Sequence, residues 1–329
     1  MKNIYPSYYE NFKCIANRCP DSCCQGWDVV VDDKSHSFYN SINGEFGDKI
    51  REVTAIDEDG DRIFLLKNGR CPFWNKDELC DIFINLGEEH LCKTCKKFPR
   101  ITMDYDCFTE HTLSLACPEA ARLILSEGFT ILSEFEDLDF SSAEYNGGVM
   151  EFLLKARAKS AEILSNKILP FNENLQNCLR FNRKIQDKLS PISKNQINKA
   201  KDFSFIFKIH ERLEFINAEY SEKIKNASGL LPGKDFDEEF RRLALYYIYR
   251  YYLNAVENFD ILSTLRKIVC AYIIIGALAN AEGKPDIIKI IQNYSKEVEH
   301  SYDNMAVLEF FFDNDDGFDV DNLIDLLRF

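Results

Sequence analysis

Apolar residues recur at three- and four-residue spacing through most of the chain beyond residue 150. This period places them on one face of an α-helix. The helices that it predicts lie at residues 151–166, 174–189, 197–224, 236–258 and 322–329. Residues 261–281 are apolar on nearly every side. We therefore expect that segment to be the central, buried helix of this half.

The first third of the chain has a different pattern, in which short apolar runs alternate with turn residues. The run at 61–67 ends at Asn68-Gly69, which is the strongest short signal for a β-hairpin. We expect a return strand after this turn, with Cys71 facing Cys80 across a second short hairpin. Residues 27–31 form another predicted strand.

These patterns predict an α+β chain. A cysteine-rich domain of short strands and turns occupies residues 1–125, a polar linker residues 126–148, and a helical domain residues 149–329. The length of 329 residues also favours two domains over one.

The cysteines concentrate in the first part: of twelve in the chain, all but Cys178 and Cys270 lie between Cys14 and Cys117. Such clustering indicates a metal site or a disulfide framework. The first residues contain no apolar core of signal-peptide length, so we expect a cytoplasmic protein with reduced thiols. This favours metal ligands. Cys178 and Cys270 have apolar neighbours and are predicted to be small core residues.

Most of these thiols fall in two sequence blocks, followed by one thiol in a different setting. The candidate metal ligands are Cys14, Cys19, Cys23, Cys24, Cys71, Cys80, Cys92, Cys95 and Cys117. Adjacent thiols rarely bind one ion together, so either Cys23 or Cys24 is spare or the two serve different centres. Eight thiols in the blocks suffice for two sites of four ligands, or for one site with several bystanders.

Cys92 and Cys95 form a C-x-x-C pair, whose spacing lets both thiols reach one metal. Pro99 is expected to end the short helix that contains them. The alternative is a thioredoxin-like redox pair, which the lack of a surrounding βαβ pattern disfavours.

Cys117 precedes Pro118 and Glu119, which suit the first turn of a helix. A thiol at that position is expected to have a lowered pKa because of the helix dipole. It is a metal ligand, a reactive thiol or an inert cap. Cys107 has no such signal and stays unassigned.

Histidines and tyrosines offer further candidates. His90 and His111 lie near the cysteine blocks and could ligate a metal, whereas His36, His210 and His300 are expected at the surface. One predicted helix is crowded with Tyr246, Tyr247, Tyr249, Tyr251 and Tyr252 beside Arg241, Arg242 and Arg250. We favour core packing for these tyrosines over a wall for a lysine chain or an adenine ring.

Charge limits the classes of partner. The net charge of −14 argues against nucleic-acid binding, which usually needs a basic face. The longest apolar run, at 268–279, is shorter than the roughly 20 residues that cross a bilayer. We expect a protein or small-molecule partner and no membrane; the sequence does not indicate an oligomeric state.

Three ordered blocks carry a resemblance to a known family. The first reads Phe12-Lys-Cys14-Ile-Ala-x2-Cys19-x2-Ser22-Cys23-Cys24-x-Gly26-Trp27. The second reads Gly69-Arg-Cys-Pro-Phe-Trp-x5-Cys80-Asp-Ile-Phe-x2-Leu-Gly-x3-Leu-Cys92-Lys-Thr-Cys95-Lys-Lys-Phe-Pro99-Arg100. The third reads Leu113-Ser-Leu-x-Cys117-Pro-Glu-Ala-Ala-Arg-Leu123. Together they resemble the signature of the flagellin lysine-N-methylases, within a wider group of cysteine-cluster proteins described as zinc- or iron-chelating. The helical remainder contains no comparably sharp motif.

The resemblance implies methyl transfer from S-adenosylmethionine to lysine side chains of flagellin, by a protein that carries a [4Fe-4S] cluster. The chain has no G-x-G fingerprint of a doubly wound methyltransferase, so the cofactor would be held in another way. It also departs from the C-x3-C-x2-C signature of radical enzymes, because Cys24 follows Cys23 directly. Radical and polar transfer both stay open, and the sequence assigns no catalytic residue.

Two other classes of function remain. In one, zinc or iron is structural, and the helical half binds a protein partner. In the other, which is weaker, the protein is an electron carrier, although such proteins are usually smaller.

Overall fold

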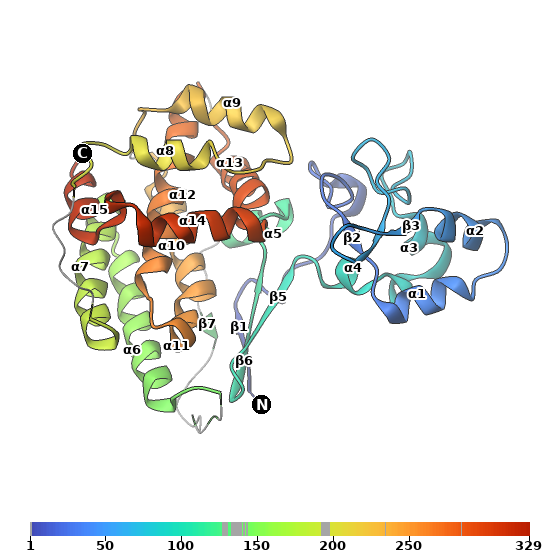
Figure 1. Cartoon of the computed structure of the whole chain (residues 1–329), viewed down its shortest axis with the longest axis horizontal. Coiled ribbons are helices and arrows are strands. Elements are labelled where there is room, and N and C mark those ends of the chain that lie inside the picture. The colour runs from blue at the N-terminus through green and yellow to red at the C-terminus, as the bar shows by residue number, and fades with distance from the viewer. Residues whose placement is uncertain are drawn as a thin grey trace.

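The computed structural model describes residues 2–126, 131–132, 140, 142, 144–191, 198–233, 235–283 and 285–329, with only the backbone at 131–132. Figure 1 shows a large helical body on one side and a smaller lobe on the other. The ribbon formed by β1 (Lys2–Pro6), β5 (Arg100–Asp104) and β6 (Phe108–Leu113) lies along the side of the body that faces the small lobe.

The small lobe combines a three-stranded sheet with short helices. Its elements are η1 (Ala16–Arg18), β2 (Val29–Val30), α1 (Asp33–Asn40), α2 (Glu45–Glu52), β3 (Thr54–Ile56), β4 (Arg62–Phe64), α3 (Asp81–Leu86), η2 (Glu88–His90) and α4 (Lys93–Lys97). The strand order is β2-β4-β3, with both pairs antiparallel. A separate apolar core contains Tyr39, Phe64 and Phe73, each 1% exposed or less. This lobe therefore has a core of its own.

The predicted Asn68-Gly69 turn is confirmed. Both residues have positive φ, 53° and 71°, and Lys67 and Arg70 exchange backbone hydrogen bonds of 2.9 and 3.2 Å. The predicted return strand is wrong, because only isolated bridges follow and β4 pairs with β2 and β3 instead. The predicted second hairpin does not continue beyond Cys80, because Asp81–Leu86 form helix α3.

A second sheet belongs to the helical body. Its order is β5-β6-β1-β7, where β7 is Ile131–Leu132, and β1 pairs with β6 in parallel, with Lys2 opposite Phe108. Ile4, Phe108 and Leu113 are completely buried in the same apolar cluster as the helices. Strands from the predicted cysteine-rich part thus complete the core of the helical body. The predicted boundary near residue 125 stays a prediction.

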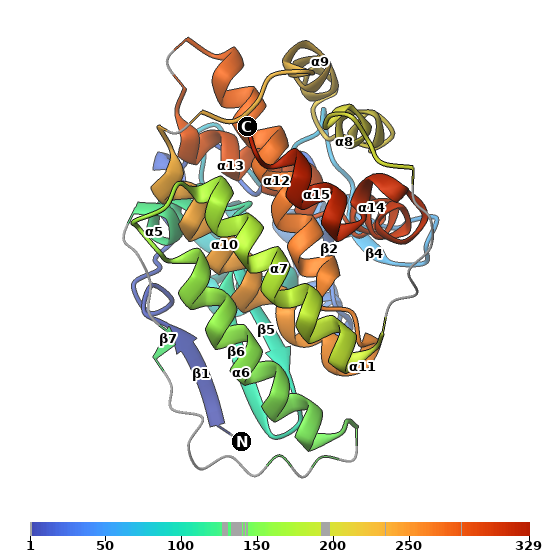
Figure 2. The same ribbon diagram turned by 90° about the vertical axis from the view of Figure 1, so that its left-hand side faces the viewer.

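Helices form the rest of the body. They are α5 (Pro118–Ser126), α6 (Gly147–Leu164), α7 (Phe171–Leu189), α8 (Ser204–His210), α9 (Ala218–Ala227), α10 (Asp237–Tyr251), η3 (Tyr252–Asn254), α11 (Ala255–Asn258), α12 (Leu262–Ala281), α13 (Ile287–Tyr294), the π-helical turn η4 (Ser295–Glu299), α14 (Tyr302–Asn314), η5 (Asp316–Phe318) and α15 (Val320–Leu326). Figure 2 shows α6, α7 and α10 running alongside one another, with β5 and β6 behind α6.

Helix α12 is the centre of the body, as the sequence predicts. It packs against α7, α9, α10 and α13. By length and composition α12 could cross a membrane, but its apolar window is 100% buried inside the protein. The apolar residues on all its sides are therefore accounted for by neighbouring helices.

The structure also corrects one helix prediction and one linker prediction. The predicted helix at 197–224 is two helices, α8 and α9, and residue 197 lies outside the described part. Asn217 begins α9 by accepting a hydrogen bond of 3.0 Å from the Glu219 backbone N–H. Within the predicted linker at 126–148, residues 127–130, 133–139, 141 and 143 also lie outside the described part, and α6 already begins at Gly147.

A buried ion pair joins the second sheet to the helices. Arg157 on α6 donates two hydrogen bonds, of 2.6 and 2.8 Å, to the carboxylate of Glu110 on β6. The two side chains are only 4% and 0% exposed. A charge removed from water is costly unless an opposite charge lies beside it. This pair therefore fixes how the sheet lies on α6.

Candidate functional site

The charges on the nine candidate ligand cysteines act on one another in one connected network, within which we name two thiol groups. The first thiol group is Cys14, Cys19, Cys23 and Cys117. The second thiol group is Cys24, Cys71, Cys80, Cys92 and Cys95. The thiols of Cys23 and Cys24 hydrogen-bond to each other, and the charge of Cys23 also acts on Cys95, so the two groups adjoin and are coupled.

The second thiol group lies in the small lobe. Cys71 and Cys92 are part of its apolar core, at 8% and 1% exposure, and Cys24 and Cys80 pack against that core. The backbone N–H of Cys71 donates to the carbonyl of Cys24 over 2.8 Å, and Cys80 bridges to Trp74. The predicted proximity of Cys71 and Cys80 is thus realised through turns rather than a regular hairpin.

The first thiol group spans the junction between the lobe and the body. Cys14 and Cys23 are exposed and lie in the loop that leads into β2, whereas Cys117 is buried directly before α5. The thiol of Cys19 donates to the carbonyl of Asp21 over 3.3 Å. One candidate ligand of this group therefore comes from the helical body.

A hydrogen bond between two neighbouring thiols lowers the pKa of one thiol and raises the pKa of the other. The bond between Cys23 and Cys24 lowers the pKa of Cys24 to about 7 and raises the pKa of Cys23. The bond between Cys92 and Cys95 likewise lowers the pKa of Cys92 and raises the pKa of Cys95. Each pair thus contains one thiol that ionises more readily, and the thiolate is the form that binds metals.

Cys117 does not have the lowered pKa that its place before a helix predicts. Burial raises the pKa of Cys117 to about 11, and hydrogen bonds from the N–H groups of Ala120 and Glu119 offset only part of this effect. Desolvation of the thiolate outweighs the helix N-terminus here. The predicted lowering of the pKa of Cys117 is wrong, and its role as metal ligand, reactive thiol or cap stays a prediction.

The thiols gather without meeting at one point. Across the described ranges, no three histidine, cysteine, aspartate or glutamate side chains lie close enough to hold a metal ion. All twelve cysteines fall within those ranges, and none of them is in a disulfide there. Thiols of this kind and number are the usual ligands of zinc and of iron–sulfur clusters. Because they do not converge on one point here, the predicted ligand set stays a prediction.

The two histidines near the cysteine blocks have other partners. The His90 ring stacks on Phe38, with centroids 4.1 Å apart. His111 uses both ring nitrogens, towards Asn3 at 3.0 Å and Thr102 at 3.2 Å. These contacts do not support a ligand role for either ring.

His210, which we expected at the surface, is completely buried. Its ring nitrogens lie 2.8 Å from the Ile206 carbonyl and 3.0 Å from the Tyr294 hydroxyl. It is therefore a satisfied core histidine.

Three polar side chains fasten the first cysteine loop to the helical body. The ammonium of Lys296 lies 2.6 Å from the carboxylate of Asp21, with side-chain exposures of 9% and 22%. Gln292 Nε2 lies 2.9 Å from the same carboxylate and 2.9 Å from the carbonyl of Ala116. Because Ala116 precedes Cys117, Gln292 holds the first cysteine loop close to Cys117, which belongs to the helical body.

Aromatic rings line the same junction. The half-buried indole of Trp27 lies 4.8 Å from the ring of His300 and 5.5 Å from that of Phe98, between centroids. The Lys296 ammonium lies 5.3 Å from the Trp27 ring centroid. Burial lowers the pKa of His300, and the positive charge of Arg250 adds to this effect.

A buried carboxylate organises the crowded tyrosines. Glu299 accepts hydrogen bonds from the hydroxyls of Ser295 at 2.6 Å, Tyr251 at 2.8 Å and Tyr246 at 3.1 Å, and it also pairs with Arg250. Tyr246, Tyr247, Tyr249 and Tyr252 are 2% exposed or less, which confirms core packing. Glu299 ends the π-helical turn that also contains Lys296, so this network fixes the turn at the junction.

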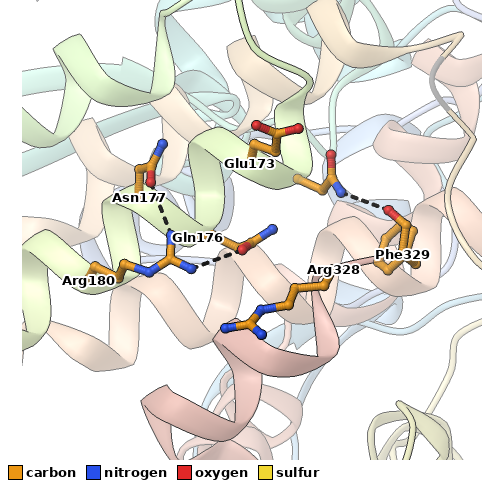
Figure 3. A pocket seen from close by; sticks show the side chains of 7 residues that line it. Glu173, Gln176, Asn177, Arg180, Arg328 and Phe329 are labelled. Atoms are coloured by element: carbon orange, nitrogen blue, oxygen red, sulfur yellow. Dashed lines mark hydrogen bonds between the residues drawn. The ribbon is translucent and has the colours of Figure 1, made fainter.

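A cavity of about 310 Å³ lies away from the thiols, between α7 and the end of the chain (Figure 3). Arg180 donates to Asn177 and Gln176, both over 3.1 Å, and the Asn172 amide donates to the carbonyl of Phe329 over 3.1 Å. These polar groups satisfy one another. The cavity offers no cysteine and adds nothing to the thiol groups.

Sequence reasoning missed the junction residues Asp21, Gln292, Lys296 and Glu299. Asp21 and Lys296 are 275 positions apart, so no local pattern could pair them. A weak signal was present, since the charged residues Lys296, Glu297 and Glu299 follow directly on the apolar helix α13.

Comparison with known proteins supplies the family. The profile described as the FliB lysine N-methylase C-terminal domain matches residues 131–326, which is the helical part rather than the cysteine blocks. The flagellar biosynthetic protein FliU of Salmonella muenchen is 31% identical over 136 residues, covering 37% of this chain and 76% of that protein.

Two proteins named lysine-N-methylase match to the same degree. Those of Salmonella choleraesuis and Salmonella typhimurium are each 31% identical over 136 residues, again 37% of this chain. The matched segment spans about a third of their length, 32% in each case. No solved structure matches significantly. Because the profile covers more than half of the chain, the chain belongs to the FliB lysine N-methylase C-terminal domain family.

Proposed function

We propose that this protein is a cytoplasmic protein-lysine N-methylase that transfers methyl groups from S-adenosylmethionine to lysine side chains of flagellin. The observation that carries the proposal is the family match over residues 131–326. The names of the relatives, lysine-N-methylase and flagellar biosynthetic protein, support the reaction and the flagellar substrate.

We also propose that the thiol groups hold a [4Fe-4S] cluster. Thiolate is the usual ligand of such clusters, and this chain gathers nine thiols beside the helical body. An open iron site would bind the amino and carboxylate groups of S-adenosylmethionine, in a chain without the glycine fingerprint of a doubly wound methyltransferase. Metal binding would draw the thiols of a group together and require them as thiolates.

The transfer is proposed to be polar. The neutral amine of the substrate lysine attacks the methyl carbon, the methyl–sulfur bond breaks, and S-adenosylhomocysteine leaves with the electron pair. Lysine titrates near pH 10.4, so its ammonium must first lose a proton. We propose that His300 accepts that proton, because its ring lies at the junction beside Trp27 and partial desolvation by its neighbours lowers its pKa, which keeps it in the neutral form that can accept a proton.

The test uses protein isolated without oxygen. Iron, sulfide and zinc are counted, the visible spectrum is recorded with and without S-adenosylmethionine, and methyl-labelled cofactor is supplied with flagellin. We expect about four irons per cluster, a spectral change with the cofactor and label on flagellin lysines. Zinc without iron, no spectral response and unlabelled flagellin would instead indicate a structural metal domain.

A further inference from the structure

We propose that the outer face of helix α14 is a docking surface for a basic, lysine-bearing segment of a partner protein. Its centre is an apolar stripe of Tyr302, Ala306 and Phe310, which we call the α14 stripe. Acidic side chains surround this stripe, and it begins two residues after His300. The identity of the partner as the methylated substrate rests on the proposed function, whereas the docking surface rests on the structure.

The α14 stripe lies on the side of the helix that faces away from the core. The buried side of α14 consists of Asn304, Leu308 and Phe312. Residues four apart share one face of a helix, and each buried residue stands two positions from a stripe residue, which places the stripe on roughly the opposite side. Figures 1 and 2 show α14 on the outside of the helical body.

The two aromatic rings of the stripe are highly exposed. Tyr302 is 94% exposed and Phe310 is 61% exposed. A single exposed apolar residue is ordinary on a protein surface. Here two aromatic rings flank an exposed alanine along about 12 Å of one helix face. Aromatic residues are enriched in the centres of protein–protein interfaces, so this arrangement is typical of a surface that a partner covers.

The chain around the stripe is strongly acidic. Residues 301–327 contain eight aspartate and glutamate residues and no lysine or arginine. Three of these acids belong to α14, and all three are exposed: Asp303, Glu309 and Asp313. Each stands three positions from a residue of the stripe, and residues three apart on a helix are neighbours. The apolar stripe is therefore bordered by negative charge.

Three cations lie beside α14 and do not reverse this charge. The ammonium of Lys267 lies 2.6 Å from the carboxylate of Glu309, and Arg266 lies 3.9 Å from that of Asp313. The two acidic side chains still have exposures of 52% and 72%. Arg212 lies over an aromatic ring of α14 instead. A second copy of this acidic face would be repelled, whereas a segment that carries lysines has the complementary charge.

The stripe starts at the junction between the lobe and the body. The ring of His300 lies 4.8 Å from that of Trp27, between centroids. Tyr302 follows two positions later, so the Cα atoms of these residues are at most about 7 Å apart. Ser301 begins α14 by accepting a hydrogen bond of 3.2 Å from the backbone N–H of Asn304. A segment that lies on the stripe therefore has one end close to His300, where the proposed proton transfer takes place.

The experiment measures binding and methylation separately, in anaerobically isolated full-length protein. The two binding probes are purified flagellin and a synthetic amphipathic helix with one leucine face and one lysine face. Calorimetry gives the affinity at low and at high salt. The test variants are Tyr302→Ser, Phe310→Ser and Asp303→Lys. The controls are Ile168→Ser, at an apolar residue between α6 and α7 that is 90% exposed, and Glu58→Lys, at an exposed acid of the small lobe.

We expect each test variant to bind both probes about tenfold more weakly, and each control to bind them as the wild type does. Binding to the wild type should also weaken as salt rises. Urea unfolding of every variant checks that the altered surface residues leave the fold intact.

The proposal is overturned if the wild type binds neither probe, or if folded test variants bind as tightly as the controls. It is also overturned if the wild type forms a dimer that the test variants dissolve, because the face would then belong to a second copy. Methylation is read by itself: a peptide that binds through the stripe, together with flagellin that gains no methyl groups, would refute the proposed function and leave the docking surface standing.

Discussion

The ammonium of Lys296 lies 2.6 Å from the carboxylate of Asp21, and this ion pair joins the π-helical turn of the body to the first cysteine loop. The loop also receives a hydrogen bond from Gln292. The position of Cys19 and Cys23 is therefore set by the helical body. Lys296 lies in the segment that matches the family, and Asp21 lies in the first cysteine block, so this contact joins two distant parts of the sequence.

Lys296→Met is expected to loosen the junction. The substitution leaves Asp21 without its positive partner in a place of low exposure, and removal of one partner from a buried pair costs about 3 kcal/mol. Unfolding in urea measures the loss, and limited proteolysis of residues 13–28 shows where it acts.

Asp21→Asn and the double variant complete a thermodynamic cycle. We expect the double variant to be more stable than the sum of the two single losses implies, because the two residues interact directly. Additive losses would mean that the pair does not hold the loop.

Gly26→Ala is expected to disturb the same junction for two reasons. Gly26 has a φ of 93°, and an added Cβ would lie 2.6 Å from Cγ2 of Ile216. Gly60→Ala is the matched control, since Gly60 has a φ of 87° and nothing within 4 Å of an added Cβ. Both should lose about 1 kcal/mol from the positive φ, and Gly26→Ala should lose more. Equal losses would show that Ile216 does not constrain the loop.

Glu110→Gln is expected to destabilise the whole body. It leaves the buried guanidinium of Arg157 without its counter-charge, at a cost of about 3–5 kcal/mol in the free energy of unfolding. Glu151→Gln on α6 is the control, because its pair with Lys155 is exposed and should matter by less than about 1 kcal/mol. Chemical denaturation of both variants makes the comparison, and similar losses would contradict the structural role of the buried pair.

The buried His210 should make the folded protein less stable as the pH falls. Burial lowers the pKa of His210 from 6.5 to about 4 in the folded protein. The unfolded chain therefore binds the proton more readily, so the stabilisation is present above pH 6.5 and is lost as the pH falls towards 4. The loss is about 3 kcal/mol over this range.

His210→Gln should flatten this part of the pH dependence, whatever its effect on stability at pH 7. Unfolding followed by circular dichroism between pH 7 and pH 4 gives both slopes. If the two proteins have the same slope, another group is responsible for the loss in acid.

His300→Gln should lower the rate of methylation most strongly near neutral pH. Higher pH deprotonates the substrate amine without help, so the difference between wild type and variant should shrink as the pH rises. Initial rates across this range test the role of His300 as proton acceptor, and a constant ratio would contradict it.

The sequence predicted most of the long helices because their apolar period is repeated over several turns. α7 and α12 begin and end near the predicted residues. The sequence did not predict helices that are too short to show a repeated apolar period. α1 and α3 have only eight and six residues, so neither shows a helical period that the sequence could reveal.

The sheet of the body was missed for a different reason. β1 pairs with β6, more than a hundred positions further on, and such a contact leaves no local signal. The same holds for Asp21 with Lys296 and for Glu110 with Arg157. The cysteine blocks could be found from spacing, whereas their division into two groups depends on long-range packing.

The most direct test of the account is the mass of flagellin lysines after incubation with S-adenosylmethionine and anaerobically isolated protein, read by mass spectrometry of flagellin peptides. Wild type and Cys178→Ser should add methyl groups to lysines, and Cys117→Ser should add none. Unmodified lysines with the metal-loaded wild type, or full methylation by Cys117→Ser, would contradict a lysine methylase that works through the junction thiols.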